Sequence, residues 1–235
     1  MIQDFKFALR QLIKSPGFTA IAVITLALAI GVNSAIFAII NGAVLRPMVP
    51  VKPQEVVNVF TARQNASHDY RPFSYNEFRE LREGGSDVFS DVAALEFALA
   101  GIGRDEGMKR SFTFLTSDNF FSMMGVKPAL GRFYNAEESR PNAESPVVVV
   151  SYAYWKRMDG RADFVGSTLQ INGQPYTVIG VTPNGFSGVS ALVAPDIWLP
   201  LGVHSHLGSA FADADDLHDL AQPKNYALNI TARMR

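Results

Sequence analysis

The sequence predicts an α+β domain of mixed strands and short helices, arranged as one body or as two subdomains, behind a single apolar helix that is long enough to cross a membrane. Residues 15–45 contain no charged side chain, and the apolar excess of the chain is concentrated before Met48. Beyond that point, short β-branched runs alternate with segments that carry helix-capping residues. This alternation is typical of a domain that mixes both kinds of element.

The apolar helix is predicted over residues 17–45, with its most apolar part at residues 18–40. At about 1.5 Å per residue this part is about 34 Å long, and the hydrocarbon core of a bilayer is about 30 Å thick. A secretory signal peptide is the alternative, but its apolar region would be about 7–15 residues long and would end at a small-residue cleavage site. The sequence after Ile40 offers only a poor site of this kind. We therefore expect the helix to be retained and to lie in the lipid bilayer.

Residues 1–16 are predicted to form an amphipathic helix at the membrane surface. Apolar residues recur there at helical spacing, and polar residues fill the other faces. Pro16 and Gly17 end this element before the chain turns into the membrane. A flexible basic tail is the alternative reading. The apolar positions are Ile2, Phe5, Leu9, Leu12 and Ile13.

The distribution of basic residues predicts which end of the helix lies inside the cell. Lys6, Arg10 and Lys14 precede the helix, whereas Arg46 and Lys52 follow it closely. Because cytoplasmic flanks are enriched in Lys and Arg, this small excess favours a cytoplasmic N-terminus. The folded domain, predicted over residues 46–235, would then lie outside the cytoplasm.

Small residues form a predicted helix-packing seam on the apolar helix. Ala27, Gly31 and Ala35 recur at intervals of four, and Asn33 places an amide within the apolar run. Small side chains let another membrane helix approach closely, and a buried amide seeks a hydrogen-bond partner. The expected partners are further transmembrane helices or a second protomer. The alternative is a lipid-facing anchor in which alanine is simply common.

Several strands and helices are predicted in the domain from local patterns. Asn172 and Gly173 favour a type I′ turn in a β-hairpin. Ser74 and Glu77 form a capping box in front of a helix, and Ser151 can cap another. Ser117 or Asp118 is expected to cap a short helix over residues 119–124 that Gly125 closes. The predicted strands cover residues 56–60, 109–115, 146–150, 168–171, 176–181, 197–201 and 228–234.

The strand predicted over residues 228–234 alternates apolar and polar side chains, and the chain stops inside it without a closing element. A domain rarely ends in this way. We therefore expect that a longer protein continues beyond Arg235 and that the domain is incomplete at this point.

Candidate chemistry is sparse. The stretch from residue 204 to 219 holds three histidines and four aspartates, but their spacing fits neither a zinc helix nor an EF-hand, so a solvated surface loop is expected there. Gly101 and Gly103 fit a dinucleotide loop poorly, and Ser187 does not lie in a nucleophile elbow. No catalytic, metal or cofactor site is predicted. The histidines and aspartates are His204, His206, His218, Asp213, Asp215, Asp216 and Asp219.

Composition excludes other classes of function. The chain has no cysteine, so it contains no disulfide, and its net charge is -1 without a basic tract. A nucleic-acid-binding surface is therefore not expected. The sequence also lacks a phosphate-binding loop with its Lys-Ser/Thr ending, so any ATP would have to be bound by another polypeptide.

Stretches along almost the whole chain carry a family resemblance. They are Lys14-Ser-Pro-Gly-Phe-Thr-Ala-Ile-Ala-Val, Leu26-Ala-Leu-Ala-Ile-Gly-Val-Asn-Ser-Ala-Ile-Phe, Leu45-Arg-Pro, Phe73-Ser-Tyr, Asn119-Phe-Phe, Gly125-Val-Lys-Pro-Ala-Leu-Gly-Arg, residues 165–183 and Pro195-Asp-Ile-Trp-Leu-Pro-Leu. Together they resemble the MacB-like, FtsX-related ABC transporter permeases, in particular the long permeases of acidobacterial type. The Pro-Gly start of the helix and the Asn-Gly hairpin are the most specific parts.

The resemblance implies a topology and a mode of action. The N-terminus would be cytoplasmic, the helix would cross the inner membrane, and residues 46–235 would be a MacB-like periplasmic core domain. Three further spans would follow, and a separate ATPase would drive a dimeric permease that transmits motion to a periplasmic partner. Two other classes stay open beside this one: a single-pass sensor that binds a ligand or partner outside the cell, and a membrane-tethered enzyme.

Overall fold

The computed structural model describes residues 10, 13–41, 51–62, 70–103, 107–189, 194–207 and 219–235. The chain divides into two compact units, Met1–Arg46 and Pro47–Arg235, and each is described here by itself. Most of the amphipathic helix predicted over residues 1–16, and the last residues of the predicted membrane helix, lie outside the described residues.

The first unit contains one long helix, α2 (Pro16–Ile40). Pro16 occupies its first turn, where the missing N–H has no intrahelical acceptor and the fixed φ favours helix. Ser15 precedes it as N-cap without a side-chain capping bond. The helix therefore begins at the Pro-Gly pair, as the sequence predicts, and its 25 residues give it a length of about 37 Å.

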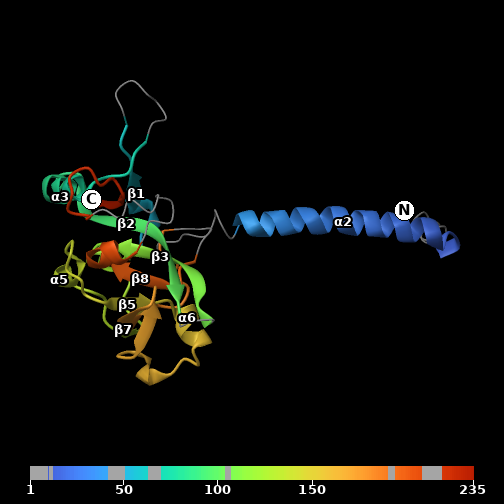
Figure 1. The fold of residues 1–235 in the computed structure, drawn as a ribbon. Coiled ribbons are helices and arrows are strands. Elements are labelled where there is room, and N and C mark those ends of the chain that lie inside the picture. The colour runs from blue at the N-terminus through green and yellow to red at the C-terminus, as the bar shows by residue number, and fades with distance from the viewer. Residues whose placement is uncertain are drawn as a thin grey trace. The chain divides into compact units, whose positions relative to one another are not determined.

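The second unit is built on one nine-stranded sheet (Figure 1). The strands lie in the order β1-β9-β2-β3-β8-β5-β7-β4, and β6 pairs with both β2 and β7. Strands β3 and β8 are parallel, as are β5 and β7, and the remaining pairs are antiparallel. The strands are β1 (Val56–Val59), β2 (Phe89–Ile102), β3 (Lys109–Thr116), β4 (Leu130–Gly131), β5 (Val147–Val150), β6 (Thr168–Ile171), β7 (Gln174–Val181), β8 (Ile197–Pro200) and β9 (Asn229–Met234).

The double pairing of β6 closes part of this sheet into a ring. Strand β6 contacts β2 through Ile171 and Ile102, and it forms the hairpin with β7, so that the path β2-β3-β8-β5-β7-β6 returns to β2. One sheet thus runs through all the described strands of the unit Pro47–Arg235.

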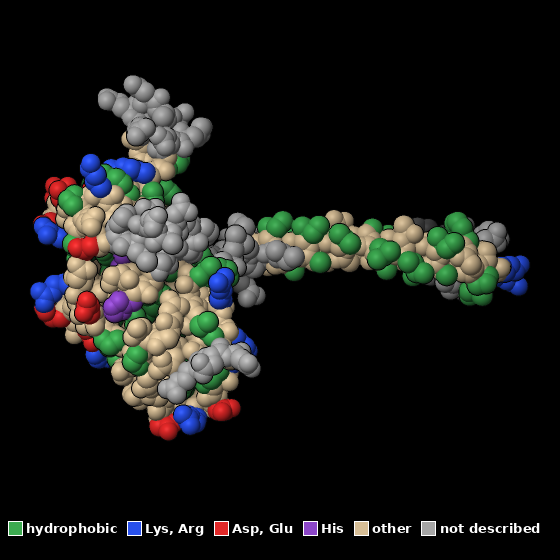
Figure 2. All heavy atoms as spheres, in the orientation of Figure 1, with side chains coloured by type: hydrophobic (Ala, Val, Ile, Leu, Met, Phe, Trp, Pro, Cys, Tyr) green, Lys and Arg blue, Asp and Glu red, His purple; other side chains and the backbone are tan. Residues whose placement is uncertain are grey.

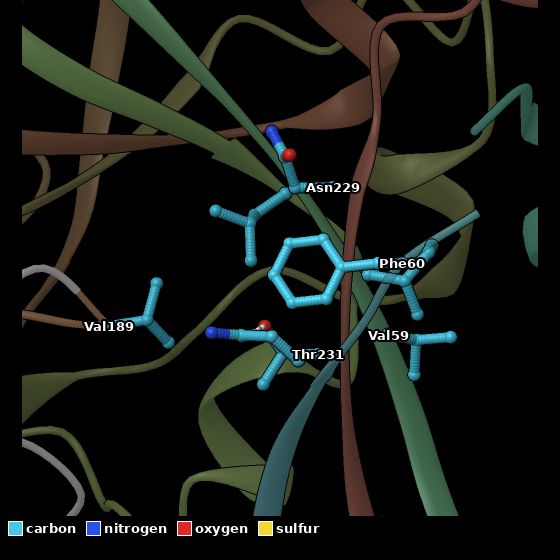
Figure 3. Close-up of a pocket in the computed structure, with 8 residues that line it drawn as sticks. Val59, Phe60, Val189, Asn229 and Thr231 are labelled. Carbon is cyan, nitrogen blue, oxygen red and sulfur yellow. Dashed lines mark hydrogen bonds between the residues drawn. The ribbon is translucent and has the colours of Figure 1, made fainter. Parts of the chain in front are cut away.

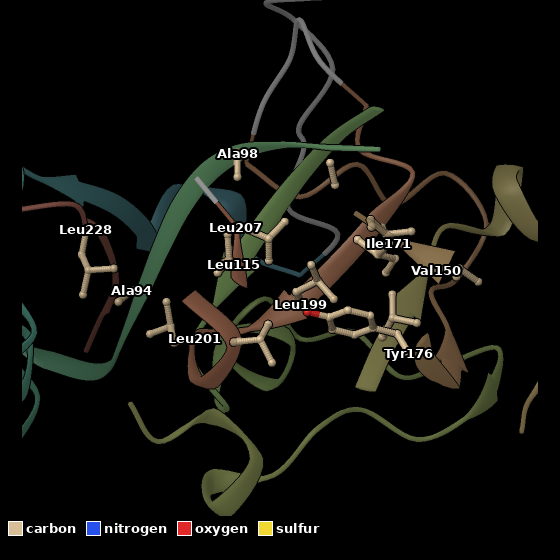
Figure 4. Close-up of a cluster of buried hydrophobic side chains, with 14 of the residues drawn as sticks. Ala94, Ala98, Leu115, Val150, Ile171, Tyr176, Leu199, Leu201, Leu207 and Leu228 are labelled. Atoms are coloured by element: carbon tan, nitrogen blue, oxygen red, sulfur yellow. The ribbon is translucent and has the colours of Figure 1, made fainter. Parts of the chain in front are cut away.

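Alternate residues of the ring strands supply two separate cores. Ile197 and Leu199 of β8 belong to one cluster, and Trp198 between them belongs to the other. The first cluster takes residues from all six ring strands, and Figure 4 shows part of it around Leu115, Ile171 and Tyr176. Short helix α4 and Phe186 cover the second cluster. Because both faces are buried, these strands do not show the polar alternation of a solvated sheet.

Helices and short 3-10 turns flank the sheet, and their caps largely follow the predictions. Ser74 and Glu77 form a capping box at α3, and Ser151 accepts a bond from the Tyr154 N–H at α6. The elements are α3 (Tyr75–Gly84), α4 (Phe120–Met123), α5 (Ala136–Ser139), α6 (Tyr152–Arg157), η2 (Pro53–Glu55), η4 (Ala162–Phe164) and η5 (Leu201–His206).

The predicted cap of α4 is wrong. Asn119, not Ser117 or Asp118, is the N-cap, and it makes no capping bond with its side chain. The amide of Asn119 instead donates to the Val92 carbonyl and the Asp91 carboxylate, and thereby ties α4 to β2. Gly125 closes the helix as predicted, with a φ of +72° and with bonds from its own N–H to Ser122 and from the Val126 N–H to Phe121. This pair of bonds is a Schellman motif.

Candidate functional site

Helix α2 has the properties of a membrane span. Its residues 16–38 have a mean hydropathy of 2.2, and none of these residues is buried against other described parts of the chain. Figure 2 shows hydrophobic side chains along its visible face, with basic side chains before its start. The hydroxyl groups of Thr19 and Thr25 donate to the carbonyls of Ser15 and Ile21, so these polar groups are satisfied inside the helix. Such internal bonding is required of any segment that crosses lipid.

The predicted seam residues lie on α2 but do not share one face. Ala27, Gly31 and Ala35 align along the helix, whereas Asn33 lies about 200° around the axis from Gly31 at 100° per residue. A Cβ atom added at Gly31 would meet nothing within 4 Å among the described residues. The small-residue stripe is therefore open to another helix, and Asn33 would need a different neighbour.

An unpredicted ionisable pair lies inside the sheet domain. Glu96 of β2 is 4% exposed and His204 of η5 is 7% exposed. The Nε2 atom of His204 lies 2.9 Å from Oε2 of Glu96, within ion-pair distance. However, neither that oxygen nor Nδ1 of His204 has a hydrogen-bond partner in the described structure. A buried polar group without a partner is costly, so each of these two groups depends on the other.

The buried position of His204 corrects one expectation. Of the stretch 204–219, which was expected to be a solvated loop, the structure describes residues 204–207 and 219. His204 and Leu207 are buried, and Leu207 belongs to the first core cluster, so residues 204–207 are not a fully solvated loop, although Ser205 and His206 are exposed. His206, in the same turn, lies 3.2 Å from the Tyr176 hydroxyl, and burial raises the pKa of that tyrosine to about 12. This turn therefore contributes to the core.

The remaining metal-site candidates are not brought together. Asp219 accepts bonds from the Asn142 side chain and the Ala221 N–H, which hold the pKa of this carboxyl below its ordinary value. His218, Asp213, Asp215 and Asp216 lie outside the described residues. Within the described part of the chain, no group of three His, Asp or Glu side chains could hold a metal ion.

The rejected glycine motif is part of the sheet. Gly101 lies in β2 opposite Arg110 of β3, and its N–H donates to the Asn172 side chain at the hairpin turn. A Cβ atom at Gly101 would lie 2.6 Å from Sδ of Met108. Because Met108 is exposed and flexible, this approach does not require glycine, and Gly101 is an ordinary strand residue bonded to the hairpin turn. Gly103 has a φ of +116° at the start of the β2–β3 connection.

A half-open cavity of about 190 Å³ lies beside the edge of the sheet, between β1, β9 and β2. Figure 3 shows the Phe60 ring next to Asn229 and Thr231, with Val189 on its other side. Among the described residues, the lining is apolar apart from two amides and one hydroxyl, and it includes no charged side chain. These described lining residues contain no pair of acid and base groups. The lining residues are Asn58, Val59, Phe60, Leu95, Val189, Asn229, Ile230 and Thr231.

Comparison with known proteins identifies the family. The family model of the MacB-like periplasmic core domain matches residues 19–233, from within α2 to the end of β9. The chain belongs to the MacB-like periplasmic core domain family. It is the periplasmic-domain part of an ABC transporter permease, as the resemblance in the sequence implies.

Relatives of this MacB-like domain agree with the assignment. The chain is 30% identical over 141 residues to the probable syringafactin export ATP-binding/permease protein SyfD of Pseudomonas syringae pv. syringae (strain B728a). The matching region is 54% of this chain but only 21% of SyfD, so the chain spans about a fifth of the length of this curated relative.

Two solved structures share the MacB-like fold. The extracellular domain of the noncanonic ABC-type transporter YknZ from Gram-positive bacteria matches with a TM-score of 0.54 at 13% identity, covering 77% of this chain and 83% of that one. The periplasmic region of MacB from Actinobacillus actinomycetemcomitans matches with a TM-score of 0.51 at 14% identity, covering 79% of each chain. At such identities these similarities establish the fold of the sheet domain.

Proposed function

We propose that this chain is the first membrane helix and the periplasmic domain of an ABC transporter permease that transmits motion and has no catalysis of its own. In this proposal α2 spans the inner membrane with its N-terminus in the cytoplasm. The sheet domain lies outside and moves when a separate ATPase subunit hydrolyses ATP. The expected partners are the lipid bilayer, further membrane helices, a second protomer and a periplasmic protein.

The family match from residue 19 to residue 233 is the observation that carries this proposal. The match includes most of α2, so the apolar helix belongs to the family unit together with the sheet. A secretory signal peptide is removed from the mature protein and is not part of its folded domain. A helix that is retained gives the sheet domain a fixed attachment to the membrane.

The chemistry of the described residues favours transmission over catalysis. The cavity beside β1 has no charged lining residue, and the buried ionisable pair of Glu96 and His204 faces the core instead of a cleft. General acid–base catalysis requires titratable groups that can reach a substrate. A closed ring of strands with two filled cores is instead suited to move as a rigid body.

The experiment uses the full-length permease, reconstituted in nanodiscs with its ATPase. This chain has no cysteine, and any cysteine elsewhere in the full-length permease or its ATPase is first replaced by serine. Two spin labels are then placed at Asn41→Cys, at the end of α2, and Lys109→Cys, at the start of β3. We expect the distance between them to change when ATP and vanadate trap the ATPase. An unchanged distance distribution, in a preparation that hydrolyses ATP, contradicts the proposal.

A further inference from the structure

One arginine from the last strand holds the segment that leads into the sheet domain. This lead-in segment, residues 51–55, is the first described part of the chain after α2, and it runs through η2 directly into β1. Arg233 lies in β9, opposite Val56 of β1 and Asp91 of β2. Its backbone is therefore fixed on both sides, and its side chain extends from a rigid strand.

The guanidinium group of Arg233 bonds to four acceptors on two separate parts of the fold, the lead-in segment and α4. Its Nη2 donates to the Val51 carbonyl at 3.0 Å, and its Nη1 contacts the Glu55 carboxylate at 3.0 Å. A longer bond of 3.5 Å runs from Nη1 to the Lys52 carbonyl. Its Nε donates to the Met123 carbonyl at 2.9 Å, at the C-terminus of α4. One side chain thus joins the lead-in segment to β9 and α4.

Two further contacts hold the same segment. The Val51 side chain packs against Gly125, where an added Cβ atom would lie 2.8 Å from Cβ of Val51. The Lys52 ammonium lies 2.7 Å from the Glu55 carboxylate. This ammonium, together with Arg233, holds the pKa of Glu55 below its ordinary value, so the acceptor of Arg233 stays ionised at neutral pH.

The geometry requires arginine at this position. A guanidinium has five N–H donors in a planar fork, whereas a lysine ammonium is a single point that cannot reach all four acceptors on the two segments together. The Arg233 side chain is only 14% exposed, so its loss would leave carbonyl groups without partners in a partly buried place. Other arginine–carboxylate pairs of the domain, such as Arg157 with Asp196, join parts of the sheet domain away from the lead-in segment.

We propose that Arg233 is a positioning residue that locks the lead-in segment to β9 and α4, so that the segment and the sheet move as one body. The inference rests on the proposed function, in which displacement reaches the sheet through α2. A loose segment between the helix and the sheet would absorb such displacement. The lock places the attachment on a strand with neighbours on both sides, instead of on β1, which has one described neighbour in the sheet.

The lock itself is tested with spin labels at Gln54→Cys and Lys109→Cys in the full-length protein in nanodiscs. The distance distribution should be narrow in the parent and should broaden in Arg233→Met. Hydrogen exchange of residues 51–59 should become faster by about tenfold, which corresponds to 1.4 kcal/mol. The matched control Arg157→Met should change neither. If Arg233→Met leaves the distribution and the exchange as in the parent, the lock does not exist.

Two additions keep this test decisive. Fluorescence of buried Trp198 verifies that each variant is folded. Arg233→Lys keeps the charge and some of the contacts. Its distance distribution should therefore be broader than that of the parent but narrower than that of Arg233→Met, and it can be measured even if Arg233→Met does not fold. If the distribution of Arg233→Lys is as narrow as that of the control Arg157→Met, the arginine fork has no role in the lock.

The role in transmission is tested with one label per protomer at Lys109→Cys, so that the measured distance reports how far the two sheet domains of the expected dimer move relative to each other. In Arg233→Met, the nucleotide-dependent change in this distance should fall at least about twofold while ATP hydrolysis continues at the parent rate. A full response in Arg233→Met would overturn the inference and leave the proposed function intact. A parent protein that does not respond to nucleotide contradicts the proposed function, and the Gln54→Cys pair then still decides whether the lock exists.

Discussion

Breaking the buried contact between Glu96 and His204 should destabilise the sheet domain far more than removing both partners. His204→Leu leaves the Glu96 carboxylate in the core without its partner, and Glu96→Met does the same to the His204 ring. Both side chains are more than nine-tenths buried, so water cannot replace the missing group. The double variant Glu96→Met/His204→Leu puts two apolar side chains of similar volume in the same space.

The expected magnitudes follow from this burial. Leaving one buried polar group without its partner costs about 1–3 kcal/mol, whereas replacing both groups with apolar side chains of the same shape can be nearly neutral. For a domain of this size, each kcal/mol lowers the melting temperature by about 2–4 °C, so each single variant should melt roughly 2–12 °C lower. The double variant should lie within about 1 kcal/mol of the parent. The coupling energy is therefore expected to be several kcal/mol.

The assay is guanidinium unfolding of the chain in mild detergent, followed by tryptophan fluorescence. Both tryptophans lie in the sheet domain, and Trp198 is fully buried, so the signal reports this domain and not α2. The control is Arg140→Met, which removes an exposed ion pair with Glu137 and should cost less than about 1 kcal/mol. If His204→Leu lowers the free energy of unfolding by no more than Arg140→Met does, the buried contact does not stabilise the domain as proposed.

Three further predictions follow from local geometry and charge. Gly173→Val should destabilise the domain by about 1 kcal/mol or more, because φ is +77° at this turn; an unchanged unfolding midpoint would show that the turn tolerates a β-branched residue. Gly31→Leu should abolish disulfide crosslinking of membrane helices through Ala35→Cys while Ala29→Leu, on another face, should not; equal crosslinking in both would make the seam an anchor face. The Arg71 guanidinium lowers the pKa of Glu77 from 4.5 to about 2, so the carboxylate's stabilisation is complete above pH 4.5 and is lost as the pH falls towards 2. Glu77→Gln should remove this acid dependence, about 1 kcal/mol for a partly exposed cap, and an unaltered pH profile would refute the assignment.

The sequence predicts elements that depend on neighbouring residues. The hairpin at Asn172 and Gly173, the Ser74 capping box and the Gly125 helix end all follow from local backbone rules, and the structure confirms each of them. Strand β2, the longest strand, was not predicted. Its alanine-rich sequence has high helix propensity, and both of its faces are buried, so the period of two that marks a strand is missing.

The energetically important polar groups could not be predicted because their partners are distant in the sequence. Glu96 and His204 meet because β3 pairs with both β2 and β8, and η5 follows β8 directly in the chain. Arg233 lies on the polar face of a strand with alternating side chains, so the sequence alone predicts that it is exposed to solvent. Its carboxylate partner Glu55 is 178 positions away and cannot be paired with it from the sequence. A buried glutamate within an apolar strand is the one signal that could have drawn attention to Glu96.

Accessibility of engineered cysteines in intact cells tests the central claim, that α2 crosses the membrane and carries the sheet domain outside the cytoplasm. The chain lacks cysteine, so single substitutions at Arg10, before α2, and at Lys109, in β3, give one reactive thiol each. With a maleimide that does not cross the inner membrane, Lys109→Cys should be labelled in intact cells, and Arg10→Cys only after the inner membrane is permeabilised. If only Arg10→Cys is labelled in intact cells, the topology of α2 is the reverse of the one proposed. If neither cysteine is labelled before the inner membrane is permeabilised, the sheet domain lies in the cytoplasm and the account is contradicted.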